Sequence, residues 1–240
     1  MLRVGQARCR SKSWPNILSQ QNTMDYDLFM LDAIALLVLM LWPIIPLWWI
    51  PVHGANKLVK NIGFLMYPIM FVLWIFIAYP IYLNRAFLLG YRIDFSLIIR
   101  AAGIFCACIG TLLQLWTVKV LTAKVITGVP EVFNGAKATL AVRGPFSHVR
   151  HPTYLSHTLF FVGIFLSSGI QAVGLIALID FLIVGLIIIP LEENELQQRF
   201  GDEYRSYMTR VPRFIPRLSK QAKTEEGEKL TDTGNSSKLA

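Results

Sequence analysis

Residues 154–189 read YLSHTLFFVGIFLSSGIQAVGLIALIDFLIVGLIII, a run of about 36 apolar and small polar residues. Asp180 is its one acidic residue, and it contains one histidine, His157, and no lysine or arginine. A helix needs roughly 20 apolar residues to cross about 30 Å of hydrocarbon, so this run is too long for one span. The sequence Ser-Ser-Gly at 167–169 interrupts the run near its middle. We therefore predict a helical hairpin with two short arms, residues 154–167 and 170–189.

Three further apolar runs precede the hairpin, and each has the length of one membrane span. They cover residues 28–50, 62–83 and 97–118. The second run has no charged residue, the first has Asp32 near its start and the third has Arg100 near its entry. Backbone polar groups inside a bilayer must bond to one another, which favours helices. We expect an all-α integral membrane protein with about five transmembrane helices.

The composition supports a membrane protein and gives the basic charge a simple explanation. Hydrophobic residues make up 54% of the chain and charged residues only 16%, whereas a soluble domain carries nearer a quarter. The net charge is +8, and basic residues gather in segments 119–150 and 199–220, on either side of the hairpin. The positive-inside rule accounts for both segments if they are cytoplasmic, without a nucleic-acid partner. Five spans then place the N-terminus outside, although its own basic residues argue against this.

Two polar segments flank the hairpin and contain most of the reactive side chains. Residues 138–157 read ATLAVRGPFSHVRHPTYLSH, and residues 191–216 read LEENELQQRFGDEYRSYMTRVPRFIP. A hairpin returns the chain to the side it left, so we expect His151, Pro152 and Tyr154 to lie near Glu192 and Glu193. Such a cluster at the membrane surface suits a polar cofactor and a lipid-like substrate, although arginine and tyrosine also serve as interface anchors.

These segments carry a family resemblance. RHPTY at 150–154, the hairpin, Glu-Glu at 192–193, FGDEY at 200–204 and VPRFIP at 211–216 resemble the isoprenylcysteine carboxyl methyltransferase and phospholipid methyltransferase superfamily. The resemblance covers about residues 115–218. It implies an integral membrane methyltransferase that uses S-adenosylmethionine and acts on a lipid or prenylated acceptor at the cytoplasmic face of the membrane.

The resemblance also implies roles for particular residues. His151 and Tyr154 are the expected catalytic residues, and His151 is the candidate base if the acceptor is an amine. His157 and Ile188 are expected at the substrate. The residues expected to hold the cofactor are Thr139, Leu140, Ala141, Val142, Phe146, His151, Pro152, Tyr154 and Glu192.

The chain departs from the family pattern at three positions. Ala138 stands where the family often has histidine, and Phe146 replaces its usual tyrosine. Ile188 stands where the carboxyl methyltransferases carry an arginine suited to pairing with a substrate carboxylate. A carboxylate acceptor therefore lacks its expected partner, which favours a neutral acceptor such as a lipid amine.

Composition and the resemblance together divide the chain into four parts. Residues 1–23 form a basic segment that we expect to be disordered, and residues 24–118 hold the N-terminal transmembrane helices. Residues 119–217 form the methyltransferase-like region with its hairpin. Residues 218–240 have almost no apolar content, so we expect a disordered tail.

Several alternatives remain open on the sequence. A reductase of the sterol-reductase type shares a related C-terminal pattern and binds a nicotinamide cofactor, and a non-enzymatic scaffold or transporter is a third possibility. His148 and His151 have the spacing of metal ligands on a helix, but Pro152 opposes a helix through them, so we predict no metal site. His157 is expected either to line the site or to make a packing hydrogen bond. Asp180 is expected to make an interhelix contact.

Overall fold

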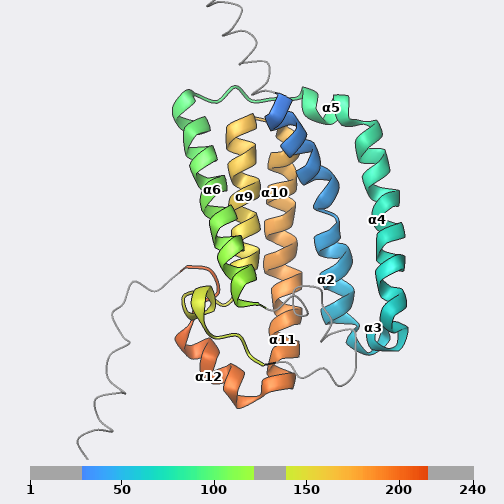
Figure 1. The fold of residues 1–240 in the computed structure, drawn as a ribbon, viewed down its shortest axis with the longest axis vertical. Helices are drawn as coiled ribbons and strands as arrows, with labels where there is room; N and C mark the ends of the chain where they lie inside the picture. The colour runs from blue at the N-terminus through green and yellow to red at the C-terminus, as the bar shows by residue number, and fades with distance from the viewer. Residues whose placement is uncertain (1–28, 122–138, 216–240) are drawn as a thin grey trace, which may run out of the picture.

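The structure, a computed structural model, describes residues 29–121 and 139–215. Within these ranges the chain is helical, and the one β-type pairing is an isolated antiparallel bridge between Arg92 and Ile170. The helices stand side by side in a bundle (Figure 1). The predicted all-α class is therefore confirmed. The two terminal segments expected to be disordered and Ala138 lie outside the described residues.

The helices follow the apolar runs of the sequence. The first half contains a helix over residues 29–41, α2 (Ile44–Gly54), α3 (Asn56–Ile62), the short η1 (Gly63–Leu65), α4 (Met66–Leu83) and α5 (Arg85–Gly90). The second half contains α6 (Leu97–Val120), η2 (Gly144–Ser147), α9 (Pro152–Ser168), α10 (Gln171–Ile183), the π-helical turn η3 (Val184–Ile188), α11 (Ile189–Phe200) and α12 (Asp202–Arg210).

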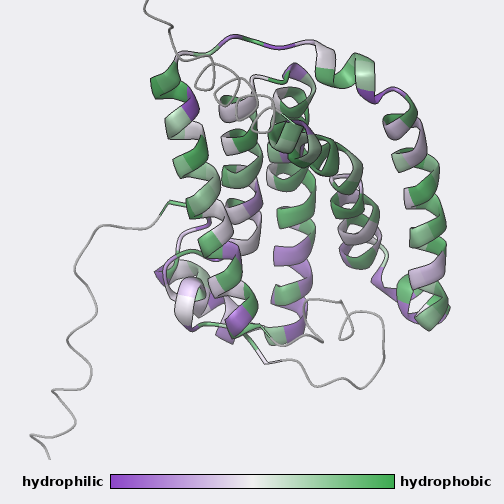
Figure 2. Ribbon diagram, turned by 45° about the horizontal axis from the view of Figure 1, so that its top comes forward, coloured by the Kyte–Doolittle hydropathy of each residue, from purple (hydrophilic) through white to green (hydrophobic). Residues whose placement is uncertain are grey.

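Among the described residues, four continuous helical stretches are long and apolar enough to cross a membrane. They are Phe29–Gly54, Asn56–Leu83, Leu97–Val120 and Gln171–Phe200. Helix α9 has 17 residues, about 26 Å at roughly 1.5 Å per residue, which is shorter than about 30 Å of hydrocarbon. The structure thus supports four spans by length, and the fifth stays a prediction. Figure 2 shows apolar residues along the helix shafts and hydrophilic ones gathered near the end that holds α11 and α12.

The turn between α9 and α10 needs a glycine at position 169. Gly169 has a φ of 72°, a left-handed conformation that ends α9. Its carbonyl accepts a 2.8 Å hydrogen bond from the Ile93 N–H, and the Gln171 N–H donates to the Tyr91 carbonyl at 3.0 Å. A Cβ at 169 would lie 2.1 Å from the Ile93 carbonyl oxygen. The turn is therefore held against the segment that leads into α6.

Small residues let α6 and α9 pack backbone against backbone. A Cβ on Gly110 would lie 2.6 Å from the Ser156 carbonyl oxygen, and one on Gly163 would lie 2.5 Å from the Ala107 nitrogen. Close approach through small residues is a common way for membrane helices to associate, because lipid tails compete poorly with tight van der Waals packing. This contact fixes α9, which begins directly at the predicted site.

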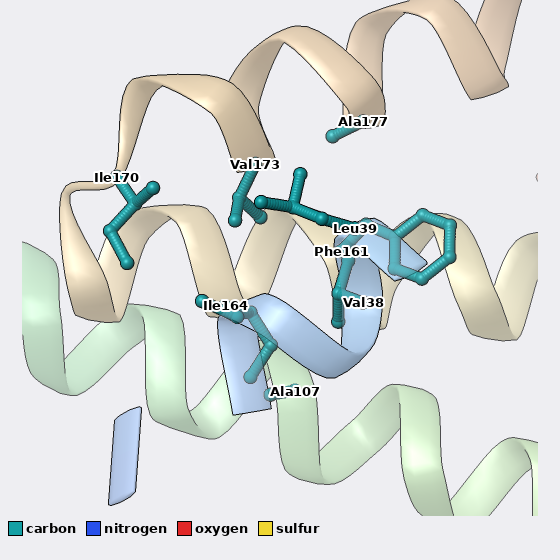
Figure 3. Packing of buried hydrophobic residues seen from close by; sticks show 9 residues of the cluster. Val38, Leu39, Ala107, Phe161, Ile164, Ile170, Val173 and Ala177 are labelled. Atoms are coloured by element: carbon teal, nitrogen blue, oxygen red, sulfur yellow. The ribbon is translucent and has the colours of Figure 1, made fainter. Parts of the chain in front are cut away.

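The main apolar core joins the first helix to α6, α9 and α10 near the end opposite α11. Figure 3 shows its side chains meeting between these helices. The buried members are Ala35, Val38, Leu39, Ala107, Phe161, Ile164, Ile170, Val173 and Ala177. The polar segments are left to gather at the other end of the bundle.

Asp180 connects three helices within the bundle. The Trp42 indole N–H donates a 3.0 Å hydrogen bond to Asp180 Oδ1, and His157 Nδ1 lies 3.0 Å from Asp180 Oδ2. Asp180 is almost completely buried. This is the interhelix contact expected from the sequence, and it also places His157 against Asp180.

Candidate active site

A cavity lies where the two polar segments meet the C-terminal ends of α2 and α6, and residues of α11 form part of its wall. Its empty volume is about 1180 Å³, a figure that includes the open space at its mouth. The lining residues are Trp49, His53, Gln114, Thr117, Val118, Leu121, Thr139, Leu140, Ala141, Phe146, Arg150, His151, Pro152, Thr153, Tyr154, Glu192, Glu195, Leu196, Arg199, Phe200, Tyr204 and Tyr207.

Most of the residues predicted at the cofactor lie around this one cavity. They are Thr139, Leu140, Ala141, Phe146, His151, Pro152, Tyr154 and Glu192. Val142 is exposed and does not line the cavity, and neither do His157 and Ile188. The sequence pattern therefore located the lining well, while the role of each residue in binding or catalysis stays a prediction.

The segment before α9 is joined to the segment after α12 through the backbone. The Arg150 N–H donates to the Pro212 carbonyl at 2.8 Å, and the His151 N–H donates to the Arg213 carbonyl at 3.3 Å. The Tyr207 hydroxyl donates to the Phe146 carbonyl at 2.6 Å. These bonds explain why RHPTY and VPRFIP occur together, since each segment satisfies backbone groups of the other.

Glu193 is the centre of a buried ionic cluster beside the cavity. It accepts hydrogen bonds from Arg150 Nη2 at 2.8 Å, from Arg213 Nη2 at 2.5 Å and from His151 Nε2 at 3.1 Å. Arg150 also donates to the carbonyls of Met208 and Val211. A single carboxylate thus holds together the start of α9, the start of α11 and the segment after α12.

The two ring nitrogens of His151 each lie beside a glutamate carboxylate. Nε2 faces Glu193, while Nδ1 lies 3.5 Å from Glu192 Oε2. Burial lowers the pKa of His151, but the neighbouring carboxylates of Glu192 and Glu193 outweigh burial and raise the pKa above its usual value. Pro152 follows at the first position of α9, where its missing N–H costs the helix nothing. The geometry favours a protonated His151 that donates hydrogen bonds.

Two side-chain oxygen atoms of cavity-lining residues lack hydrogen-bond partners among the described residues. They are the Glu192 Oε2 oxygen and the Tyr204 hydroxyl, and both atoms are buried. The Glu192 oxygen has His151 Nδ1 at 3.5 Å, too far for a well-formed hydrogen bond. Buried polar groups in native proteins almost always have partners, so an unpaired acceptor and an unpaired donor in one cavity indicate a polar ligand.

The two tyrosines of α12 remain neutral. Burial raises the pKa of Tyr204, and burial likewise raises the pKa of Tyr207 to about 12. A neutral phenol donates a hydrogen bond but does not remove a proton at ordinary pH. Tyr207 uses its donor on the Phe146 carbonyl, while the Tyr204 hydroxyl has no hydrogen-bond partner among the described residues.

Ile188 lies in an apolar environment and is not among the residues that line the cavity. It is fully buried in a cluster with Tyr154, Val184 and Ile189. It belongs to η3, the π-helical turn just before Pro190. The wider turn accommodates Pro190, which lacks the N–H that a regular helix needs at that position. The turn therefore affects the direction in which the Glu192 side chain projects from α11.

The sequence did not indicate the contribution of α2 to the cavity. Trp49 and His53 line it from this helix, and the His53 ring contacts Glu195 of α11. Glu195 follows Glu192 by three residues, so the shared helix face was a signal that could have identified Glu195. Trp49 and His53 lie at the end of an apolar run far away in the sequence, and no local pattern marked them.

Within residues 29–121 and 139–215, no group of three or more His, Cys, Asp or Glu side chains is arranged to hold a metal ion. His148 is exposed directly after η2, where its Nδ1 lies 3.0 Å from the Ser147 hydroxyl. His151, in contrast, is buried against Glu192 and Glu193, so the two histidines lie in different environments.

Residues 98–203 match a family described as phospholipid methyltransferase. The chain is 33% identical over 81 residues to the cobalt-zinc-cadmium resistance protein CzcN of Cupriavidus metallidurans, a match covering 34% of this chain and 37% of that protein. It is 32% identical over 87 residues to the nickel-cobalt-cadmium resistance protein NccN of Alcaligenes xylosoxydans xylosoxydans, covering 36% and 40%. The chain thus matches less than half of each relative's length.

Proposed function

We propose that this chain, which belongs through residues 98–203 to the phospholipid methyltransferase family, is a membrane methyltransferase that uses S-adenosylmethionine to methylate a lipid-like acceptor. The observation that supports the proposal most is the pair of unpartnered buried atoms, Glu192 Oε2 and the Tyr204 hydroxyl, in the cavity beside His151. An acceptor and a donor of hydrogen bonds at one end of an aromatic-lined cavity suit a zwitterionic nucleoside cofactor.

The residues of the cavity fit this cofactor by their chemistry. Glu192 can accept hydrogen bonds from an amino group or ribose hydroxyls, and Tyr204 can donate one to a carboxylate. Leu140, Phe146 and Phe200 offer apolar and aromatic surface to an adenine ring. When bound, S-adenosylmethionine supplies an activated methyl group on a sulfonium sulfur. The protein then has to hold the acceptor in line with that methyl group and exclude water.

The charges around the cavity favour an acceptor that is neutral when it reacts. Arg150 pairs with Glu193, and Arg199 pairs with Glu195 at 2.6 Å, so both cavity arginines already face carboxylates. Ile188, at the position of the family's carboxylate-pairing arginine, is buried among apolar side chains. A substrate carboxylate would have to displace one of these pairs, whereas a lipid amine would not.

The membrane orientation follows from charge. The arginines of α11, α12 and the segment after α12 lie at the end of the bundle that contains the cavity. The positive-inside rule assigns such a surface to the cytoplasm. We therefore place the site at the cytoplasmic interface, where a lipid head group and a soluble cofactor both have access.

The test uses the purified full-length protein in detergent or nanodiscs. It is incubated with methyl-labelled S-adenosylmethionine and a total lipid extract, and labelled products are identified by mass spectrometry. Thermal shifts with S-adenosylhomocysteine and with NADPH are measured in parallel. We expect a labelled lipid and stabilisation by S-adenosylhomocysteine alone. Stabilisation by NADPH without S-adenosylhomocysteine binding would support a reductase and overturn the proposal.

A further inference from the structure

His53 belongs to a part of the chain that the family match does not reach, yet it lines the same cavity as Glu192. It lies near the end of α2, whereas the match begins at residue 98. The N-terminal spans therefore contribute a titratable side chain to a cavity whose other titratable groups come from residues 150–207.

The ring of His53 is fixed in position on two sides. Nδ1 lies 2.5 Å from Glu195 Oε2, and both side chains are largely buried. The Trp49 ring stacks on the imidazole at 5.2 Å between centroids, with the two planes 8° apart. The carboxylate contact and the stacked ring together hold the His53 imidazole in one orientation.

The two carboxylate oxygens of Glu195 contact different partners, the Arg199 guanidinium and the His53 imidazole. Its Oε1 accepts a hydrogen bond from Arg199 Nη2 at 2.6 Å, while Oε2 faces His53. The guanidinium compensates the carboxylate charge, so Glu195 can orient the ring without requiring a positive charge on it. A hydrogen bond from Nδ1 to a carboxylate also selects the tautomer in which Nε2 carries the lone pair.

His151 is less suited to accept a proton. Both of its nitrogens lie beside carboxylates. Arg150 and Arg213 pair with Glu193, but among the described contacts no arginine pairs with Glu192 as Arg199 does with Glu195. Glu192 and Glu193 favour the imidazolium form of His151, which has no lone pair to offer. Of the two cavity histidines, His53 has the arrangement of a general base.

We propose that His53, oriented by Glu195, is the general base for the methyl acceptor; this rests on the proposed methyltransferase function with an amine acceptor. The imidazole takes one proton from the protonated amine of the acceptor. The freed nitrogen lone pair then forms a bond to the methyl carbon as the carbon–sulfur bond breaks and its electrons remain on sulfur. The products are the methylated ammonium, neutral S-adenosylhomocysteine and an imidazolium that returns its proton to water.

The test compares His53→Ala and His53→Gln with the control His148→Gln, which changes an exposed histidine. Loss of a general base typically lowers the rate by about 10²–10⁴-fold. We expect kcat for a lipid amine to fall in this range in both His53 variants, with the affinity for S-adenosylhomocysteine within about twofold of the unmodified protein. Added imidazole should restore part of the activity of His53→Ala. His148→Gln should behave like the unmodified protein.

The outcomes separate the two proposals. If the unmodified protein neither binds S-adenosylhomocysteine nor transfers a methyl group, the proposed function fails. If it does both, and His53→Gln retains its kcat, the assignment of the base fails while the proposed function stands. If His53→Gln loses cofactor affinity and thermal stability together and imidazole rescues nothing in His53→Ala, the pair is a structural link between α2 and α11, and the assignment is again overturned.

Discussion

Arg150 and Glu193 form a buried ion pair in which two guanidinium nitrogens converge on one carboxylate oxygen, Nη2 at 2.8 Å and Nε at 3.1 Å. Their side chains are 11% and 7% exposed. The two residues are 43 positions apart, at opposite ends of the α9–α10 hairpin. The pair therefore fastens the entry of the hairpin to its exit, and Arg213 adds a second guanidinium to the same carboxylate.

Glu193→Gln should destabilise the protein strongly. The substitution keeps the size of the side chain but leaves Arg150 and the His151 imidazole without their shared anion. Removing one partner of a buried ion pair typically costs about 3–5 kcal/mol of unfolding free energy. Thermal unfolding in detergent checks the loss, with Glu203→Gln on the exposed face of α12 as the control. Equal melting temperatures for the two variants would contradict the role of Glu193.

The stability of the protein should fall as pH rises above neutral because of His151. Its folded-state pKa is raised, whereas the unfolded chain has the ordinary value of about 6.5. The stabilising contribution is therefore complete below about pH 6.5 and is lost as pH rises through the folded-state pKa. Melting temperatures measured from pH 6 to 9 should decline in the unmodified protein. In His151→Gln this part of the decline should disappear, and an identical slope would refute the assignment.

Glu192→Gln and Tyr204→Phe should each weaken cofactor binding without unfolding the protein. The Tyr204 hydroxyl has no hydrogen-bond partner among the described residues, so Tyr204→Phe removes no bond of that kind. Glu192→Gln keeps an amide oxygen that can still accept the hydrogen bond from Tyr154. A hydrogen bond involving a charged group contributes about 1.5–3 kcal/mol, or roughly tenfold to a hundredfold in affinity. Calorimetry with S-adenosylhomocysteine measures the effect. An unchanged affinity in both variants would remove these residues from the cofactor site.

Gly163→Ala should separate α9 from α6. The added Cβ would lie 2.5 Å from the Ala107 nitrogen, a backbone atom that cannot rotate away. Overpacking of this kind typically costs about 1–3 kcal/mol. Gly185→Ala is the matched control, because a Cβ there meets nothing within 4 Å. Comparable melting temperatures for the two variants would show that α6 and α9 can move apart without cost.

Local patterns were sufficient for much of the fold and the site. The apolar runs predicted the helices because length and hydropathy are local properties, although α2 continues to Gly54 where we expected its run to end at residue 50. Its helix passes through Pro51, which a sequence pattern normally takes as an end. The residues around RHPTY and Glu192 were found because both polar segments adjoin the hairpin. Their proximity follows from the chain reversal at Gly169.

Contacts that join distant segments could not be predicted in the same way. His53 meets Glu195 across 142 positions, and Trp42 meets Asp180 across 138. These pairs depend on how the first spans pack against the hairpin, which no periodicity encodes. Ile188 was expected at the substrate because its relatives have arginine there. In this chain an isoleucine finds more stabilisation in the apolar cluster around Tyr154 than at the cavity wall.

The last prediction concerns the choice of acceptor. Ile188 is fully buried against Tyr154, Val184 and Ile189, and no described acid is in that cluster to pair with a cation. Ile188→Arg should therefore lower thermal stability and should not improve methylation of the native acceptor, whereas Ile188→Leu, which keeps the volume, should leave both nearly unchanged.

A farnesylated cysteine analogue with a free carboxylate should be methylated much more slowly than a lipid amine by the unmodified protein. Its carboxylate would need Arg150 or Arg199, and each already faces a glutamate at 2.8 Å or less. Burying an anion without a partner costs several kcal/mol, which corresponds to at least about a hundredfold in rate. Competition assays with both acceptors in the same nanodisc measure the ratio directly. A faster reaction with the farnesylated analogue would show that one of these arginines changes partner during turnover and that the acceptor is a carboxylate.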